Sequence, residues 1–300
     1  MFEFAFIILQ GLYKLIIYLL LCFSVTAQAA DFSRWTPHLS YYDGKELVRD
    51  GRYLYALMGS NLLVCDIVAK TSTPITRISH GLARKSIAHI GFSHKRKTLV
   101  LLYDDGFVDL LRLQTGEVLH FPHLVDSQKE DLVARRLRVQ DDHAFVTTNK
   151  GFLWIDLAQA FVRGHFDVGQ CEDVALWGTH LFAAYGGKFY HIDRRGNLND
   201  LSQWTLALNA HVNAIAPSAQ TLFVSLDPDQ GANAGLWSIS APSLQAVDNT
   251  AAQVAPSAGW QHFDKEYRGY QLRVDTEGQL LAYQQGRIIR VAPNNIAAFS

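Results

Sequence analysis

The feature that most constrains the fold of this chain is a short apolar hairpin that recurs along the sequence. In the stretch LVLLYDDGFVDLL, from Leu99 to Leu111, two apolar runs flank Asp-Asp-Gly. Asp-Gly is a preferred pair for the tight turn of a β-hairpin, because glycine adopts the positive φ that such turns need. A lone two-stranded hairpin is only marginally stable in water, so this hairpin requires neighbouring strands.

Five further segments have the same order of apolar strand, turn residues and second apolar strand. They are RYLYALMGSNLLVCDI from Arg52, HAFVTTNKGFLWIDL from His143, HLFAAYGGKFYHID from His180, TLFVSLD with GLWSIS from Thr221, and QLLAYQQGRIIRV from Gln279. Most of them recur near the blade period of roughly 40–45 residues that is typical of β-propellers. The sequence therefore predicts an all-β fold, a single β-propeller of about six to seven four-stranded blades.

Weaker strand candidates between the hairpins supply the remaining strands of each blade. Examples are ITRIS from Ile75 and LRVQ from Leu137. Helical periodicity is nearly absent beyond the N-terminal segment, and only DLVARRL from Asp131 predicts a short helical turn. The small, polar segment from Ala241 to Gly259 predicts a long loop between the last two blades, with a degenerate blade as the alternative.

The N-terminal residues predict a secretory signal peptide over residues 1–30, followed by a propeller domain over residues 31–300. Lys14 precedes the apolar run LIIYLLLCFSV, and the small-residue segment AQAA follows it, which places cleavage just before Ala30 or Asp31. The apolar stretch MFEFAFIILQ before Lys14 leaves an uncleaved membrane anchor as the alternative.

Export leaves two cysteines in the mature chain, Cys65 and Cys171. An exported chain can pair them, but two cysteines are too few for a disulfide framework. Cys65 lies in the apolar strand LLVCDI, which favours unpaired, buried thiols.

Composition excludes two classes of protein. Hydrophobic residues make up 49% of the chain, which excludes a disordered protein, and the formal net charge of -1 gives no basis for nucleic-acid binding. The basic run from His94 to Lys97 is short and lies between strands, which indicates a polar loop.

No catalytic signature is present, and we expect no catalytic residue, no cofactor and no metal site. The sequence lacks a nucleophile elbow, a phosphate loop, a dinucleotide fingerprint and an HExxH motif. Adjacent carboxylates lie near predicted turns, where solvated pairs are ordinary. These pairs are Asp104-Asp105, Asp141-Asp142 and Glu172-Asp173.

An aspartate recurs at what we interpret as the end of the second strand of four hairpins. The four residues are Asp66, Asp109, Asp156 and Asp193. A ring of metal ligands is one interpretation, but hard-cation sites need several clustered oxygens. The pattern favours aspartates whose side chains cap the following turns.

The aromatic segment RWTPHLSYYD, from Arg34 to Asp43, follows the predicted signal peptide. It predicts a strand that closes the ring against the last blade and so removes an open sheet edge. An exposed aromatic binding patch is the alternative.

Several motifs resemble those of PorZ-like N-terminal β-propellers, components of the type IX secretion machinery of Bacteroidetes. The resemblance is carried by the order Trp-x-x-His-Leu-Ser-Tyr after the signal peptide, LLVCD, Gly-Leu, and the hairpin LLYDDGFVDL. The motif residues, which we expect to be mostly structural, are Trp35, His38, Ser40, Tyr41, Asp66, Tyr103, Gly106 and Asp109.

The resemblance implies a seven-bladed propeller that is exported and displayed at the outer surface. It also implies membership of an attachment complex that processes secreted cargo and anchors it to lipopolysaccharide, in which the protease is a different subunit. Members of this family carry a second propeller and a C-terminal β-sandwich, whereas these residues have room for one propeller. A truncated product and a single-propeller relative are both consistent with that length, and so is retention in the periplasm.

The first functional hypothesis is a non-enzymatic exported scaffold that binds proteins of the cell envelope, with lipopolysaccharide or another glycan as a further ligand class. The alternatives are a periplasmic glycan-sensing module like those of hybrid two-component regulators, and a propeller hydrolase or lyase of polysaccharides. Because loops carry function on rigid scaffolds, the candidate binding segments are the loops after Asp66 and Asp109 and the insertion Asp227–Asn233.

Overall fold

The computed structural model describes residues 43–122, 132–240, 259–264, 267, 271–274, 279–284, 287–292 and 295–299, with side chains described as far as Tyr283. In these ranges the chain forms six four-stranded antiparallel sheets, and the strands of each sheet are hydrogen-bonded in chain order. The all-β propeller prediction is confirmed.

The first three sheets contain the hairpins that begin at Arg52, Leu99 and His143. The first sheet consists of β1 (Gly44–Asp50), β2 (Tyr53–Met58), β3 (Asn61–Asp66) and β4 (Thr71–Ile75). The second consists of β5 (Ile87–Ser93), β6 (Thr98–Tyr103), β7 (Val108–Arg112) and β8 (Val118–Phe121). The third consists of β9 (Ala134–Gln140), β10 (His143–Thr148), β11 (Gly151–Asp156) and β12 (Phe161–Phe166).

The other three sheets follow in the same way. The fourth consists of β13 (Cys171–Trp177), β14 (His180–Tyr185), β15 (Lys188–Asp193) and β16 (Thr205–Leu208). The fifth consists of β17 (Val212–Pro217), β18 (Thr221–Leu226), β19 (Gly235–Ser240) and β20 (Trp260–Asp264). The sixth consists of β21 (Gln271–Val274), β22 (Leu280–Gln284), β23 (Arg287–Ala292) and β24 (Asn295–Phe299). Each recurring hairpin is thus the central pair of strands in one sheet.

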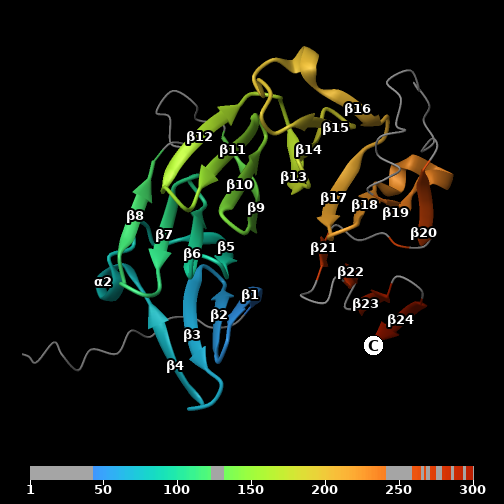
Figure 1. Cartoon of the computed structure of the whole chain (residues 1–300). Coiled ribbons are helices and arrows are strands. Elements are labelled where there is room, and N and C mark those ends of the chain that lie inside the picture. The colour runs from blue at the N-terminus through green and yellow to red at the C-terminus, as the bar shows by residue number, and fades with distance from the viewer. Residues whose placement is uncertain are drawn as a thin grey trace, which may run out of the picture. The chain divides into compact units, whose positions relative to one another are not determined.

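Neighbouring sheets are joined by apolar packing. The first strands of consecutive sheets lie side by side, in the order β1, β5, β9, β13, β17 and β21 (Figure 1). Strand residues alternate between the two faces of a sheet, and each pair of neighbouring sheets shares one buried cluster. The boundary of the third and fourth sheets, for example, buries Phe145, Phe152, Trp154 and Trp204. Burial of aromatic and aliphatic side chains at these boundaries stabilises the fold.

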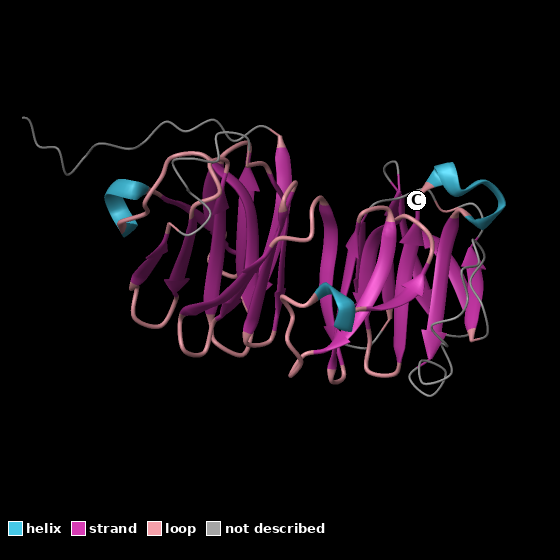
Figure 2. Ribbon diagram, turned by 90° about the horizontal axis from the view of Figure 1, so that it is seen from above, coloured by secondary structure: helices cyan, strands magenta, loops and turns pink. Residues whose placement is uncertain are grey.

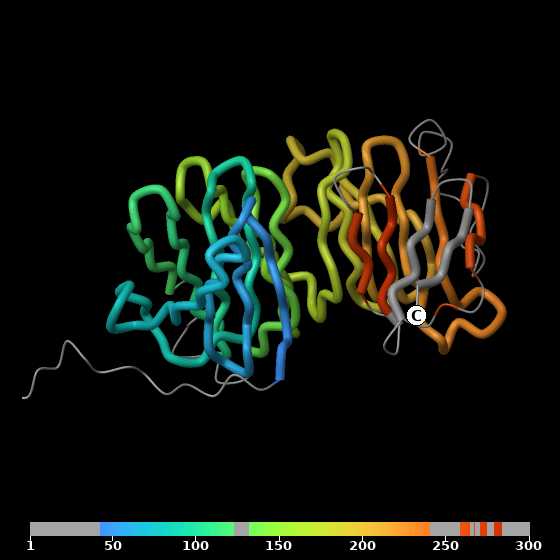
Figure 3. The backbone as a smooth tube through the Cα atoms, turned by 90° about the horizontal axis from the view of Figure 1, so that it is seen from below, coloured from blue at the N-terminus to red at the C-terminus, as the bar shows by residue number. Residues whose placement is uncertain are grey.

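Strand connections gather at two ends of the sheets (Figure 2). One end carries the connections between sheets and the turns between second and third strands, and we call it the crossover end. The other carries the turns from first to second and from third to fourth strands, and we call it the turn end. Figure 3 follows the chain through these connections from sheet to sheet.

A β-bulge recurs near the crossover end in each of the first five sheets. It lies at the second residue of the first strand, which we call the inner strand. The strand register skips Lys45, Ala88, Arg135, Glu172 and Asn213. A bulge adds one unpaired residue and re-aims the side chains around it. The residues that follow the bulges therefore occupy equivalent positions: Glu46, His89, Arg136, Asp173 and Ala214.

Two secondary-structure predictions were wrong. The segment ITRIS is not a strand, because β4 ends at Ile75 and α2 (Arg77–His80) follows, capped by reciprocal hydrogen bonds between Thr76 and Ser79. The segment DLVARRL is not helical, because its residues from Ala134 onward belong to strand β9. The strand prediction for LRVQ is confirmed by the same element.

The segment from Ala241 to Gly259 does not connect two blades. It joins β19 to β20, which pair with each other in the fifth sheet, and residues 241–258 lie outside the described ranges. Two short 3₁₀ helices, η2 (Leu201–Gln203) and η3 (Pro228–Asn233), lie in connections.

The predicted signal peptide and the aromatic segment before Asp43 also lie outside the described residues. In the part that is described, no helix has the length and apolar character needed to cross a membrane. Cys65 is half-buried, Cys171 is fully buried, and neither forms a disulfide.

Candidate functional site

The motif residues around the Asp-Asp-Gly turn form a buried hydrogen-bond network. Asp109 is fully buried, and its Oδ2 accepts hydrogen bonds from the hydroxyl of Tyr103 at 2.6 Å and from the backbone N–H of Ala83 at 2.8 Å. Its Oδ1 contacts Nδ1 of His120 at 2.7 Å. Burial, followed by the hydrogen bond to Asp109, raises the pKa of Tyr103 well above its usual range.

Three of the motif residues, Tyr103, Gly106 and Asp109, lie in or beside this network. Gly106 adopts a φ of 79° in the turn between β6 and β7, which brings Tyr103 and Asp109 together. The bond from Ala83 ties the segment after α2 to that hairpin. Trp35, His38, Ser40 and Tyr41 lie outside the described residues, so their predicted structural role stays a prediction.

The recurring aspartates divide into two kinds. Asp66, Asp156 and Asp193 end their strands, and their side chains accept backbone N–H groups of the next turn, as predicted. At Asp66 the hydrogen bond from Ala69 is the first cause of a lowered pKa. Asp109 was wrongly grouped with them, because it is the second residue of β7 and lies inside the network above. Among the described residues no group of three or more His, Cys, Asp or Glu side chains could hold a metal ion.

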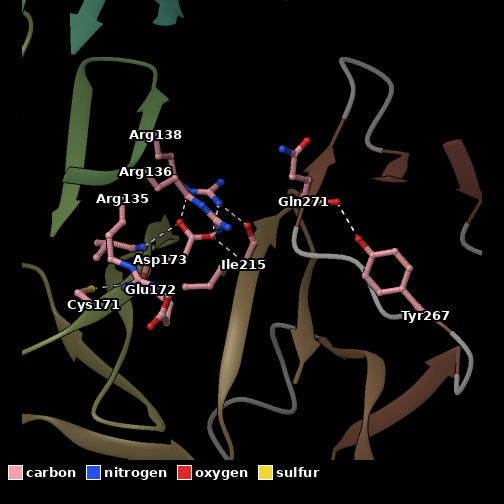
Figure 4. Close-up of polar contacts among 10 residues, drawn as sticks. Arg135, Arg136, Arg138, Cys171, Glu172, Asp173, Ile215, Tyr267 and Gln271 are labelled. Atoms are coloured by element: carbon pink, nitrogen blue, oxygen red, sulfur yellow. Dashed lines mark hydrogen bonds and ion pairs between the residues drawn. The ribbon is translucent and has the colours of Figure 1, made fainter. Parts of the chain in front are cut away.

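The prediction of a solvated Glu172-Asp173 pair near a turn was wrong. Both residues lie in strand β13, and Asp173 is fully buried. Its carboxylate lies between Arg136 and Arg138 of strand β9 (Figure 4). The interaction therefore crosses the boundary between the third and fourth sheets.

Five hydrogen bonds satisfy the Asp173 carboxylate. Oδ2 accepts from Arg136 at 2.7 Å, from Arg138 at 2.5 Å and from the backbone N–H of Ile215 at 2.8 Å. Oδ1 accepts from Nε of Arg138 at 3.1 Å and from the N–H of Val174 at 2.9 Å. Burial alone would raise the pKa of Asp173, but the charges of the two arginines outweigh it and hold that pKa below its usual range.

The equivalent position in the first sheet makes the same kind of contact. Glu46 accepts a hydrogen bond from the N–H of Ile90 at 2.7 Å and contacts Nδ1 of His89 at 2.7 Å, both in the second sheet. In both places a carboxylate after the bulge bonds to the N–H that follows the equivalent position of the next sheet. These carboxylates are therefore structural links between sheets, with no lone pair left for chemistry at Asp173.

The basic run also links sheets. Lys97 donates to Asp50 of the first sheet at 2.6 Å, and both Lys95 and Arg96 donate to Asp142 of the third sheet at 2.5 Å. The prediction of a polar loop is confirmed, and its charges are paired at both neighbouring sheets.

The predicted binding loops do not lie on one face. The loops after Asp66 and after β7 lie at the turn end, whereas the Asp227–Asn233 insertion joins β18 to β19 at the crossover end. The turn end carries most of the exposed large apolar side chains of the described residues. These are Tyr53, Ile67, Val68, Phe161 and Leu201.

The first sheet contributes three of these side chains, those of Tyr53, Ile67 and Val68. Ile67 and Val68 form the turn after β3, and Val68 is 69% exposed. Tyr53 begins the paired strand β2, and the Arg52 guanidinium lies over its ring at 5.1 Å. We call Arg52, Tyr53, Ile67 and Val68 the turn-end patch. Exposed aromatic, aliphatic and arginine side chains in one place are typical of protein-binding surfaces.

Solved structures share the fold. The chain aligns with PorZ of Porphyromonas gingivalis, described as an essential bacterial surface component of the type IX secretion system, at a TM-score of 0.72 and 20% identity over 88% of this chain. It spans about a third of the length of that protein, 34%. The Cps50 (Swd1) β-propeller domain of Myceliophteria thermophila aligns at a TM-score of 0.61 and 11% identity, over 88% of this chain and 87% of that domain.

A third similar structure is the extracellular domain of a protein assigned to the hybrid two-component systems of B. thetaiotaomicron. It aligns at a TM-score of 0.52 and 11% identity, over 85% of this chain and 33% of that one. No curated protein matches the chain. At these identities the structural likeness establishes the fold and nothing more.

A family model provides the assignment that structural likeness cannot. The model for the PorZ N-terminal β-propeller domain of the type IX secretion system matches residues 54–205. That range includes the Tyr103–Asp109 network and the Asp173 link. The chain therefore belongs to the PorZ N-terminal β-propeller family.

Proposed function

We propose that this propeller is a non-enzymatic, exported scaffold that binds proteins of the type IX secretion machinery at the cell envelope, through its turn-end patch. The family assignment supports the pathway, because PorZ of Porphyromonas gingivalis is a surface component of that system. Both the periplasm and the outer surface are compatible with such a role.

The observation that carries the proposal is the exposure of the turn-end patch. Ile67 and Val68 lie at the tip of a turn whose backbone is fixed by Asp66, which accepts hydrogen bonds from the N–H groups of Val68 and Ala69 at 3.0 Å each. The exposed side chains are therefore presented by an ordered turn on a rigid sheet. Preorganised apolar contacts of this kind favour association, because little conformational freedom is lost on binding.

The polar interior supports a scaffold over an enzyme. Asp173 and Asp109 have the burial expected of catalytic carboxylates, but structural donors occupy both. General acid–base catalysis requires a carboxylate within hydrogen-bond reach of a substrate, and these groups are enclosed. A polysaccharide hydrolase or lyase would need other residues.

Affinity capture from the native host tests the proposal. The bait is the tagged chain, and the envelope is solubilised gently before co-purifying proteins are identified by mass spectrometry. A second bait carries Ile67→Asp and Val68→Asp, and a matched control carries Ile78→Asp, since Ile78 is a 99% exposed aliphatic residue at the crossover end.

We expect secretion components of the outer membrane to co-purify with the unaltered bait and with Ile78→Asp, and to be lost with the double variant. Recovery of the bait alone would contradict the proposal. Equal recovery with the double variant would contradict the assignment of the binding surface.

A further inference from the structure

A hollow lies where the outer part of the third sheet meets the connection between β15 and β16 of the fourth. It has a volume of about 340 Å³ and is lined by Trp154, Arg163, Phe166, Arg194, Gly196, Asn197, Leu198 and Asn199. The floor is apolar, because Trp154, Phe166 and Leu198 are buried. The rim is polar, and the same connection carries the exposed Leu201 of the turn end.

Two guanidinium groups at this rim are incompletely neutralised. Arg163 lies over the Trp154 ring at 4.9 Å, and its nearest carboxylate oxygen, of Asp156, is 3.6 Å away. Arg194 is exposed, and its side chain makes no ion pair or hydrogen bond with the described residues. By contrast, its neighbour Arg195 makes two side-chain hydrogen bonds to Asp193, at 3.0 and 2.6 Å.

His143 lies beside the Trp154 floor of the hollow. Nδ1 of His143 accepts a hydrogen bond from the Trp154 indole at 3.2 Å. Burial is the first cause of its lowered pKa, and the charges of Arg163 and Arg194 lower it further, although Asp156 and Asp142 act in the opposite direction. Charges of both signs therefore lie near His143.

Side-chain amides complete the rim. The Asn197 side-chain oxygen accepts from the N–H of Asn199 at 3.2 Å, and this bond holds the loop in shape. Nδ2 of Asn197 and the Asn199 side chain make no hydrogen bond with the described residues. Amides of this kind pair with peptide N–H and C=O groups, while arginine side chains bind carboxylates.

We propose that this hollow binds a carboxylate of a partner polypeptide, held by Arg163 and Arg194, with Asn197 and Asn199 on the adjoining peptide groups. This inference rests on the proposed scaffold function and specifies the chemistry of a second contact beside the turn-end patch. The carboxylate belongs to an acidic side chain or to a chain terminus, and the experiment distinguishes the two.

Three short peptides serve as probes, each titrated into the isotopically labelled protein while the Trp154 indole N–H resonance is followed. The first, acetyl-Gly-Glu-Gly-Leu-amide, carries a side-chain carboxylate. The second, acetyl-Gly-Gln-Gly-Leu, carries a terminal carboxylate, and the third is its neutral amide. Glucuronate is titrated in parallel as an acidic sugar.

We expect one of the two carboxylate peptides to shift the Trp154 resonance with saturation, and the neutral amide to leave it unchanged. Arg194→Ala weakens that binding at least about tenfold, in line with the loss of a charge-assisted hydrogen bond. Arg112→Ala, which removes an arginine paired with Glu117 on the second sheet, changes net charge equally and leaves the affinity unchanged.

Equal shifts from the neutral amide, equal affinity of Arg194→Ala, or tighter binding of glucuronate than of both peptides would each overturn the inference. The outcome is separable from that of the capture experiment. Capture that succeeds while no peptide binds would refute the carboxylate site alone. Peptide binding without capture would refute the scaffold function alone.

Discussion

Arg138 and Asp173 are joined across the boundary between the third and fourth sheets by two hydrogen bonds, from Nε to Oδ1 at 3.1 Å and from Nη2 to Oδ2 at 2.5 Å. Arg138 also donates to the backbone carbonyl of Ile215 at 2.6 Å, in the fifth sheet. One guanidinium thus contacts the inner strands of two following sheets. The planar donor geometry of arginine suits this double role, which lysine cannot reproduce.

Replacing Asp173 tests the importance of this link. We expect Asp173→Asn to lower the free energy of unfolding by about 3 kcal/mol, because it leaves two guanidinium groups beside a neutral amide at a buried site. Urea unfolding followed by circular dichroism measures the change. Glu117→Gln, which breaks an exposed pair with Arg112, is the control and should have little effect; equal effects of the two variants would refute the structural role of Asp173.

The raised pKa of Tyr103 predicts that the stability of the fold depends on pH in the alkaline range. Its pKa in the folded protein lies above the ordinary value of 10.0. Above that pH the unfolded chain ionises while the folded protein keeps the proton, so the free energy of unfolding falls as pH rises. Tyr103→Phe should be less stable by about 1–2 kcal/mol at neutral pH, since Asp109 loses a donor. The variant should also lose less stability than the unaltered chain between neutral and alkaline pH; parallel pH profiles would contradict this explanation.

The lowered pKa of His191 predicts that the stability of the fold depends on pH in the acidic range. Burial, followed by the charge of His180, lowers its pKa from 6.5 to about 4, and its ring stacks on Phe182 at 5.4 Å. The unfolded chain binds a proton at His191 below pH 6.5, whereas the folded protein does not until the pH nears 4. The free energy of unfolding is therefore highest above pH 6.5 and falls as pH falls toward 4. The loss is on the order of 2 kcal/mol after allowance for solvent screening. His191→Phe keeps the stacking and should flatten this part of the pH profile in urea unfolding; an unchanged slope would exclude His191 as its source.

Gly151 predicts a steric effect on the third sheet. Its φ is +146°, and an added Cβ would collide with the carbonyl oxygen of Phe166 on the neighbouring strand. We expect Gly151→Ala to lower the free energy of unfolding by about 3 kcal/mol. Gly116→Ala is the matched control, because Gly116 has a φ of +73° but open space around it, and about 1 kcal/mol is expected there. Thermal unfolding of both variants measures the two losses of stability. A loss in Gly151→Ala no larger than that in Gly116→Ala would contradict the expectation.

The hairpins were predictable because their signals are local. Alternating apolar residues and turn residues such as Asp105-Gly106 specify a strand pair without reference to the rest of the chain. The aspartate caps at Asp66, Asp156 and Asp193 were predictable for the same reason, since their partners lie within three residues.

The errors arose where tertiary contacts outweigh local preference. The arginine-rich strand β9 has good helix formers, but Arg136 and Arg138 extend toward a carboxylate that lies 35 to 37 residues later. Asp173 was misassigned as a solvated turn residue because its arginine partners lie on another strand, 35 to 37 residues earlier in the chain, and the local sequence gives no sign of them. At ITRIS a local signal was present but missed, because Thr76 and Ser79 have the spacing of a helix cap, whereas the isoleucines suggested a strand.

The turn-end patch was only partly predictable. The sequence indicated the loop after Asp66, but it could not show that Tyr53 and Arg52 lie beside that loop, since this depends on the register of β2 with β3. Nor could it separate the two ends of the sheets, which decides that the Asp227–Asn233 insertion lies elsewhere.

The most direct test of the scaffold account is site-specific photo-crosslinking in the native envelope. A photoreactive amino acid replaces Val68 in one strain and Ile78 in another, because both side chains are exposed but lie at opposite ends of the sheets. We predict that position 68 crosslinks to a component of the secretion machinery and that position 78 does not. Absence of crosslinks at position 68, or the same partner at both positions, would contradict a scaffold that binds through its turn-end patch.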